Sequence, residues 1–269
     1  MNSPDEIISF EELVRLHRVS EDTFTAVSPK YVWGRVYGGQ VVAQALNAAI
    51  QTVDIDYRVH SVHAYFIRGG TSEESIEYEV DRIRNGRSFI TRRVVAKQTS
   101  GAILNLAASF QITESGPDIQ KCSIPDSIPP PEELQSDNWT PIMERKVIPD
   151  GILENGHGVW IRLNGNMPEN DRIAELGLTY TSDDAPFDAA VRLHPKFTGT
   201  WDTDNPPTFF SASLDHAVWF HQTTNPYEWH FHHHIGLAHM GNRGLATGAI
   251  YSIDGKYIAT VTQEILQRL

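Results

Sequence analysis

The segment Trp229-His230-Phe231-His232-His233-His234 holds the densest group of chemically capable side chains in the sequence. If it forms a strand, alternate residues share a face, so His230, His232 and His234 lie on one side. Three imidazoles on one face are typical of an open zinc site whose coordination is completed by water. Histidines on a partly solvated strand are the simpler interpretation. We adopt it, and we predict no metal and no cofactor.

A second group, Ser213-Leu214-Asp215-His216, has the residue types of a serine hydrolase triad. Neighbours on a strand point to opposite faces, so Asp215 and His216 do not easily serve one site. The sequence also lacks the Gly-x-Ser-x-Gly turn of α/β-hydrolases and the glycine-rich loops that bind phosphates or dinucleotides. Cys122 stands among Lys121, Ser123 and Pro125, a setting that does not favour a catalytic thiolate. None of these motifs identifies the chemistry.

The position of Gln263 is unusual for a polar residue. It follows Tyr257, Ala259 and Val261 at alternate positions, so a strand would place it on the same face as apolar side chains. An unpaired amide on such a face costs about 1–3 kcal/mol. We therefore expect this glutamine to have a specific hydrogen-bonding partner or a function.

The elements that must position these residues are predicted to occur twice. The separation of Ser61 and Gln111 equals that of Ser213 and Gln263, and similar segments recur between them in the same order. Repeated order and spacing are the sequence signature of a duplicated structural unit. We therefore predict two copies of one fold in this chain.

Each copy is predicted to be one helix followed by antiparallel strands. Apolar residues recur at helical spacing after Gly38-Gly39, and a matching helix is expected from Asp171 to about Ala190. Hairpin turns are expected at Asn85-Gly86 and Asp254-Gly255. The strands are expected at residues 62–67, 76–84, 89–97 and 102–111, and at residues 209–220, 228–239, 244–253 and 257–266. A helix wrapped by an antiparallel sheet, twice over, is an α+β double hotdog.

A proline-rich segment separates the two copies. Proline fixes φ and lacks a backbone donor, so this segment is not expected to form a central strand or a long helix. We interpret it as an extended connector that wraps one half. The predicted domains are an N-terminal hotdog at 1–116, the connector at 117–150 and a C-terminal hotdog at 151–269.

Composition excludes several classes of function. The net charge of −12 argues against nucleic-acid binding. The sequence contains no run of about 18 apolar residues, so no membrane-spanning helix is predicted. With one cysteine, no intrachain disulfide is possible, and the acidic N-terminus lacks the pattern of a secretory signal. Both features favour an intracellular location. It is expected to be cytoplasmic or, because Gln267-Arg268-Leu269 resembles a weak import signal, peroxisomal.

Several motifs together resemble the acyl-CoA thioesterase II family, which includes bacterial and peroxisomal enzymes. The resemblance covers nearly the whole chain outside the connector. The motifs are Tyr37-Gly38-Gly39-Gln40-Val41-Val42-Ala43-Gln44-Ala45-Leu46, His60-Ser61-Val62-His63-Ala64-Tyr65-Phe66-Ile67-Arg68, Arg84-Asn85-Gly86-Arg87-Ser88-Phe89, Arg92-Arg93-Val94, Val159-Trp160-Ile161-Arg162, Tyr180-Thr181-Ser182-Asp183, Leu214-Asp215-His216 and Thr262-Gln263-Glu264.

The resemblance implies a double-hotdog enzyme that hydrolyses acyl-CoA, its substrate partner, to a free carboxylic acid and CoA. The family holds the attacking water with an aspartate, a Ser or Thr and a glutamine. Their positions here are Asp183, Ser213 and Gln263, in the C-terminal hotdog. The stretch between Asp183 and Ser213 is longer than in the bacterial enzyme. Its extra loop, at residues 198–207, is expected to reshape the acyl pocket.

These residue types suit thioester hydrolysis. Asp183 can accept a proton from water, while Ser213 and Gln263 can fix a water by donating and accepting hydrogen bonds. Backbone N–H groups near Gly38-Gly39 are candidate donors to the oxyanion. Direct attack by Asp183, which would give an anhydride, remains an open alternative.

Other questions also stay open at this stage. A non-hydrolytic hotdog, such as an acyl binder or a specialised biosynthetic protein, is the alternative function. A hotdog dehydratase would need an Asp–His pair in the helix region, which we do not find. The acyl chain length and the residues that contact CoA are not predicted. Two hotdogs in one chain mimic the common hotdog dimer, and further pairing into a homo-oligomer is a possible expectation.

Overall fold

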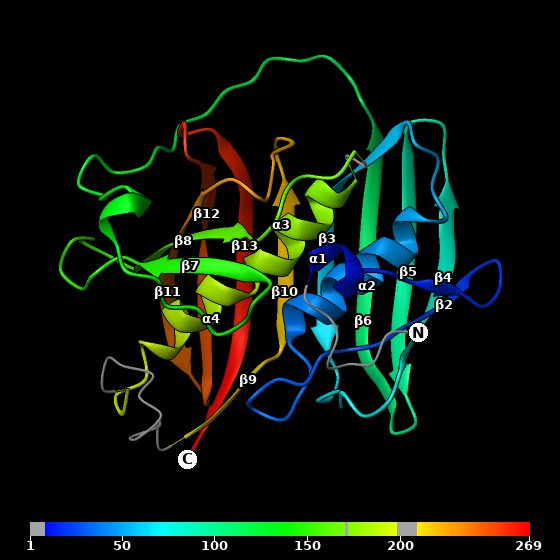
Figure 1. The fold of residues 1–269 in the computed structure, drawn as a ribbon, viewed down its shortest axis with the longest axis horizontal. Coiled ribbons are helices and arrows are strands. Elements are labelled where there is room, and N and C mark those ends of the chain that lie inside the picture. Colours follow the sequence, from blue (N-terminus) through cyan, green and yellow to red (C-terminus); the bar gives the residue numbers. More distant parts are fainter. Residues whose placement is uncertain (1–8, 170–171, 198–208) are drawn as a thin grey trace.

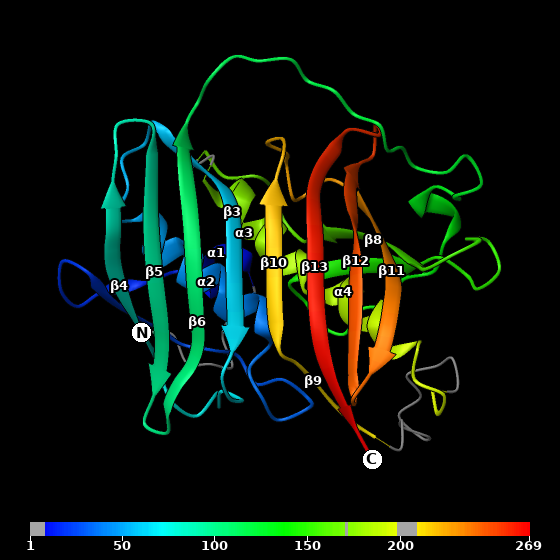
Figure 2. The ribbon, with the colours of Figure 1, turned by 180° about the vertical axis from the view of Figure 1, so that it is seen from behind.

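The computed structural model describes residues 9–169, 172–197 and 209–269. In these residues the strands form one 13-stranded sheet of order β1-β2-β4-β5-β6-β3-β10-β13-β12-β11-β8-β7, with β9 also paired to β13 (Figures 1 and 2). The order is symmetric around the β3–β10 pair: β4-β5-β6-β3 on one side corresponds, in reverse, to β10-β13-β12-β11 on the other side. Two equivalent halves therefore meet edge to edge, which confirms the predicted α+β double hotdog.

The main helix and the four long strands of the first half follow the predicted order, and three short elements that were not predicted come before them. Its short N-terminal elements and its main helix are α1 Phe10–Leu13, β1 His17–Arg18, β2 Thr23–Ala26 and α2 Gly38–Ile50. Its four long strands are β3 Tyr57–Phe66, β4 Ile76–Asn85, β5 Phe89–Gln98 and β6 Gly101–Ile112.

The second half contains more elements than the first. Before its helices lie η2 Pro131–Glu133, β7 Met143–Val147 and β8 His157–Leu163. Two helices follow, α3 Ile173–Ser182 and α4 Asp184–Val191. The remaining strands are β9 Phe210–Ser213, β10 Asp215–Phe220, β11 His230–Met240, β12 Arg243–Ser252 and β13 Tyr257–Arg268.

The helices α2, α3 and α4 all lie on one face of the sheet, and Figure 2 shows the opposite face without a covering helix. Helix α2 packs closely because small residues line it: Ala43, Ala45, Ala48 and Ala49 are almost fully buried. Burial of apolar surface between the helices and the sheet provides most of the driving force for folding. It also places the beginning of α2 beside the end of α3, which is where the site forms.

The two halves are joined by backbone pairing as well as by packing. Strands β3 and β10 are antiparallel neighbours, with Val62 opposite Val218, and both side chains are completely buried. Because the pairing leaves no free strand edge at the centre, the halves form a continuous sheet. Residues from both halves therefore meet in one core.

The single helix predicted from Asp171 to about Ala190 is wrong: α3 ends at Ser182 and α4 begins at Asp184. The physical reason is Pro186, which has no N–H to donate to the carbonyl of Ser182 and whose ring would clash with it. Within the first turn of α4 the missing N–H costs nothing. Asp183 therefore occupies the junction between two helices. Asp171 lies outside the described residues.

The predicted connector contains regular structure near its end. Strand β7 pairs with β8 at the outer edge of the second half, while Cys122 is exposed. An edge position is compatible with the nearby prolines, because an edge strand leaves half of its backbone groups unpaired. The domain boundaries at residues 116 and 150 stay a prediction.

Two further expectations concern a loop and a membrane span. The loop expected to reshape the acyl pocket, at residues 198–207, lies outside the described residues. No helix in the described ranges is long and apolar enough to cross a membrane.

Candidate active site

Asp183 lies at the junction of α3 and α4 and is almost completely buried. Its Oδ2 accepts a hydrogen bond from the backbone N–H of Gly39, at 2.8 Å, in the first turn of α2. N–H groups in the first turn have no partner within their helix, and the helix dipole favours negative charge there. The first half of the chain thus holds a carboxylate that belongs to the second half.

The two glycines at the beginning of α2 make this approach possible. A Cβ on Gly38 would lie 2.7 Å from Asp183 Oδ2, and a Cβ on Gly39 would lie 2.4 Å from the Tyr180 carbonyl oxygen. Any larger residue would push the two helices apart. The Gly39 N–H, a predicted oxyanion donor, is bound to Asp183 in this structure.

Gln263 and Ser213 approach the same region from the sheet. Gln263 is completely buried on β13, and its Nε2 donates to Ser213 Oγ at 2.8 Å. Ser213 ends β9, which pairs with β13 through Ser213 and Ile265. The glutamine therefore has the specific partner that its position on an apolar face suggests.

His216 is a site residue that the sequence patterns did not reveal to us. Its Nδ1 lies 2.7 Å from Gln263 Oε1 and 3.9 Å from Asp183 Oδ1, and its Nε2 lies 2.8 Å from Ser182 Oγ. Strand alternation correctly separates Asp215 from His216, because Asp215 instead accepts the backbone N–H of Glu264. Alternation alone does not show whether Asp215 or His216 points towards the interior of the protein. A signal was present in the sequence, since His216 shares a face with the apolar Val218.

The electrostatics of the site favour a neutral histidine and a carboxylate that titrates near neutrality. Burial raises the pKa of Asp183 to about 7, although the Gly39 N–H and the Gln263 side chain act in the opposite direction. The adjacent Asp184 raises it further. Burial also lowers the pKa of His216 to about 4. A base with a pKa close to the ambient pH is well matched to proton transfer.

The Asp184 carboxylate is held away from the site by a buried arginine. Arg145 on β7 contacts Asp184 at 3.2 Å and Asp188 at 2.9 Å, both on α4. The indole Nε1 of Trp139 also donates to Asp184, at 2.8 Å. Neutralisation of this neighbour matters, because two unpaired carboxylates side by side would raise the pKa of Asp183 further.

The histidines on β11 are buried, so the expected partly solvated strand is wrong for one face of it. His230, His232 and His234 are at most 3% exposed. His230 is bound to Thr224 Oγ1, and burial lowers the pKa of all three. Among the residues that the structure describes, no group of three or more His, Cys, Asp or Glu is arranged to hold a metal ion.

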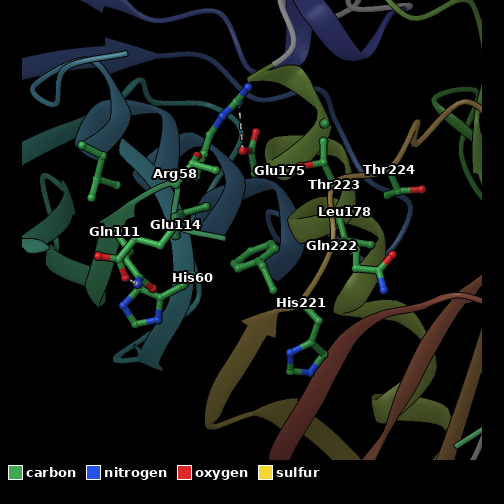
Figure 3. A pocket seen from close by; sticks show the side chains of 15 residues that line it. Arg58, His60, Gln111, Glu114, Glu175, Leu178, His221, Gln222, Thr223 and Thr224 are labelled. Carbon is green, nitrogen blue, oxygen red and sulfur yellow. Dashed lines mark hydrogen bonds and ion pairs between the residues drawn. The ribbon is translucent and has the colours of Figure 1, made fainter. Parts of the chain in front are cut away.

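A cavity of about 270 Å³, lined by residues of both halves, lies at the opposite end of the β3–β10 seam (Figure 3). The symmetric strand order makes it the counterpart of the Asp183 region, and Gln111 lines it. Matching register shifts at Ile103 in β6 and Ile258 in β13 make Ala108, not Gln111, the structural equivalent of Gln263. The chemistry differs: Gln111 binds Glu114, and at the beginning of α3 the side chain of Glu175 pairs with Arg58. The Asp183 constellation is thus not repeated at the second end.

Comparisons with known proteins agree with this fold. Residues 28–111 match the model of the acyl-CoA thioesterase N-terminal domain, and residues 134–266 match the acyl-CoA thioesterase model. The second match begins inside the range that we assigned to the connector. Together the two models cover most of the chain.

Individual relatives match over four fifths or more of their length. Acyl-CoA thioesterase 2 of Haemophilus influenzae is 34% identical, with 95% of this chain and 96% of that protein covered. Acyl-coenzyme A thioesterase 8 of Mus musculus is 32% identical, with 87% and 81% covered. The crystal structure of acyl-CoA thioesterase II from Mycobacterium marinum has a TM-score of 0.83 and 31% identity, with 96% and 97% covered.

The double-hotdog fold with a buried carboxylate beside a helix N-terminus defines a thioester hydrolase of the hotdog class. The comparisons identify it further: this chain belongs to the acyl-CoA thioesterase family. The predicted family, and with it the predicted thioesterase activity on acyl-CoA, is confirmed.

Proposed function

We propose that this thioesterase cleaves acyl-CoA by direct attack of a water molecule that Asp183, Ser213 and Gln263 hold between them. The observation that carries the proposal is the approach of three elements to one point. The carboxylate comes from the α3–α4 junction, the hydroxyl from β9 and the amide from β13. Gln263 contacts Ser213 directly, and His216 lies within 4 Å of both Gln263 and Asp183.

In the first step Asp183 takes a proton from the water as its oxygen attacks the thioester carbon. The new C–O bond gives a tetrahedral oxyanion, which the positive end of α2 stabilises. The C–S bond then breaks, and the CoA sulfur receives the proton from Asp183. The products are a carboxylic acid and free CoA, and the enzyme returns to its initial state.

The Asp183→Asn substitution tests the role of the base. It keeps the size of the side chain but removes the proton acceptor, so kcat for CoA release should fall by at least about 100-fold. Asp81→Asn is the matched control: it alters an exposed ion pair between Asp81 on β4 and Arg93 on β5, and it should keep wild-type turnover. Near-normal turnover of the Asp183 variant would refute the proposed base.

Isotope labelling separates water attack from direct attack by Asp183. With direct water attack, many turnovers in H₂¹⁸O label only the acid product. An anhydride intermediate would also introduce ¹⁸O into the peptide that contains Asp183, because water can attack the enzyme's own acyl carbon. Mass spectrometry of that peptide after turnover decides between the routes.

Assembly and location can be proposed at a coarser level. We infer that the sheet face without helices pairs with a second copy, since Trp219 and Tyr65 stand there at the β3–β10 seam and are 36% and 62% exposed. Light scattering of the wild-type protein and of Trp219→Lys, which should lose the pairing, tests this inference.

For location, a fluorescent tag at the N-terminus, with and without Gln267-Arg268-Leu269, distinguishes a peroxisomal from a cytoplasmic protein.

A further inference from the structure

Four side chains beside Asp183 form one hydrogen-bonded chain. Ser182 Oγ lies 2.8 Å from His216 Nε2, His216 Nδ1 lies 2.7 Å from Gln263 Oε1, and Gln263 Nε2 lies 2.8 Å from Ser213 Oγ. Ser182, His216 and Gln263 are completely buried. Groups without access to solvent must satisfy one another, so the direction of each bond depends on the next.

Only two proton arrangements satisfy this chain. In the first, His216 carries its proton on Nδ1 and donates to the Gln263 carbonyl oxygen, which turns the amide N–H groups towards Ser213. In the second, the proton is on Nε2, the Gln263 amide is reversed, and its carbonyl oxygen faces Ser213. Each arrangement fixes one histidine tautomer and one orientation of the amide.

The carboxylate selects between the two. With the proton on Nδ1, Gln263 directs N–H donors towards the region shared by Ser213 and Asp183, where its amide lowers the pKa of the carboxyl group. In the reversed arrangement an amide oxygen would stand near a buried carboxylate, where like partial charges repel each other. The Thr179 carbonyl oxygen, at 2.9 Å, and His216 Nε2, at 2.8 Å, then compete for the single proton of the Ser182 hydroxyl, and this arrangement requires that it reach Nε2.

We propose that His216 is a positioning residue: its Nδ1–H holds the Gln263 amide so that the N–H groups, not the oxygen, face the nucleophilic water. This inference rests on the proposed function and deepens it. His216 does not itself touch the substrate or take the proton in this mechanism. It acts through Gln263. Because His216 already holds the Gln263 amide in the required orientation, no free energy is spent on reorienting the amide during the reaction.

Two isosteric variants separate positioning from packing. The Asn amide nitrogen is as many bonds from Cβ as His Nδ1, whereas the Gln amide nitrogen matches Nε2. His216→Asn can therefore still donate to Gln263, and His216→Gln cannot. We expect His216→Gln to reduce kcat by about 10- to 100-fold with KM close to wild type, and His216→Asn to restore most of the loss. His60→Gln, in the first half, is the control and should retain wild-type kcat.

Nitrogen NMR of the wild-type protein tests the tautomer without any substrate. The His216 ring should show a protonated Nδ1 and an unprotonated Nε2 at neutral pH, and Gln263→Leu should change the Nδ1 signal. A proton on Nε2, equal losses of kcat in the Asn and Gln variants, or full activity of His216→Gln would each overturn the proposal. Absence of acyl-CoA hydrolysis by the wild-type chain would instead refute the proposed function, while the NMR result would still decide the arrangement.

Discussion

At the scale of single residues, the site depends on one carboxylate whose surroundings act in opposite directions. Burial raises the pKa of Asp183, and the Gly39 N–H and Gln263 lower it, so that the value is about 7. A fully exposed aspartate would be a weak base, and a buried one without donors would stay protonated. The compromise gives a base that is about half ionised at neutral pH.

The pH dependence of kcat follows from this value. Turnover needs the carboxylate, so kcat should fall about tenfold per pH unit below pH 7 and level off above it. His216, with a pKa of about 4, stays neutral over this range and should add no second limb. The measurement is kcat at saturating substrate from pH 5 to 9. A limb near pH 4 would contradict the assignment of the base.

The same shift predicts a stability cost. The folded-state pKa of Asp183 lies above its unfolded value of about 3.8, so the unfolded chain loses this proton first as pH rises. The free energy of unfolding should therefore decrease by roughly 1.4 kcal/mol per pH unit between about pH 4 and 7, or about 4 kcal/mol at most. The free energy of unfolding of Asp183→Asn, relative to that of wild type, should therefore rise between about pH 4 and 7 and should not change further above pH 7. Urea titrations at several pH values check this, and a pH-independent difference would argue against it.

At the scale of elements, the helix junction and the helix beginning make the site. Pro186 ends the backbone pairing of α3, so Asp183 turns towards α2 and does not continue a helix surface. The beginning of α2 meets it closely because Gly38 and Gly39 carry no Cβ. Neither helix alone would create a site, since each supplies one partner of a single hydrogen bond.

Gly39→Ala tests this close approach. The added Cβ would lie 2.4 Å from the Tyr180 carbonyl oxygen, so α2 must shift away from α3 and the bond to Asp183 must lengthen. We expect a loss of stability of about 1–3 kcal/mol, measured by thermal unfolding, and a lower kcat. Gly116→Ala is the matched control, because a Cβ there meets nothing within 4 Å. Wild-type melting and turnover of Gly39→Ala would show that the contact is not required.

At the scale of the whole molecule, the duplication supplies two ends of the β3–β10 seam, of which one carries the proposed catalytic set. Gln263 is enclosed by Ser213 and His216, whereas Gln111 binds Glu114 beside a cavity that contains the Arg58–Glu175 pair (Figure 3). The first half instead contributes the beginning of α2 to the site of the second half. The chain therefore has one asymmetric site across a nearly symmetric seam.

Paired substitutions of the two glutamines test this asymmetry. Gln263→Ala removes an oriented donor from the site and should reduce kcat by about 100- to 1,000-fold. Gln111→Ala changes the same residue type at the other end of the seam and should leave kcat near wild type. The assay is CoA release by both pure proteins at saturating substrate. Comparable losses in the two variants would indicate that both ends take part in catalysis.

The sequence by itself determined the duplicated layout, the long strands and hairpin turns of each half and the family, because alternation, turn residues and repeated spacing are local properties of the chain. It also singled out Gln263, since an amide on an apolar face is costly wherever the strand lies. It did not reveal β1, β2, β7 or β8, or the division of residues 209–220 into β9 and β10. The grouping of Asp183, Ser213 and Gln263 rests on the family resemblance, because their spacing along the chain does not by itself bring them together.

Only the tertiary structure decided which groups surround that carboxylate. The Gly39 N–H lies 144 residues from Asp183 in sequence, and His216 faces Gln263 because of the sheet register. The inward face of the β11 histidines likewise depends on the position of α4 over the sheet. Such contacts arise when two halves pack through burial of apolar surface, and no local pattern encodes the final orientation of one half against the other.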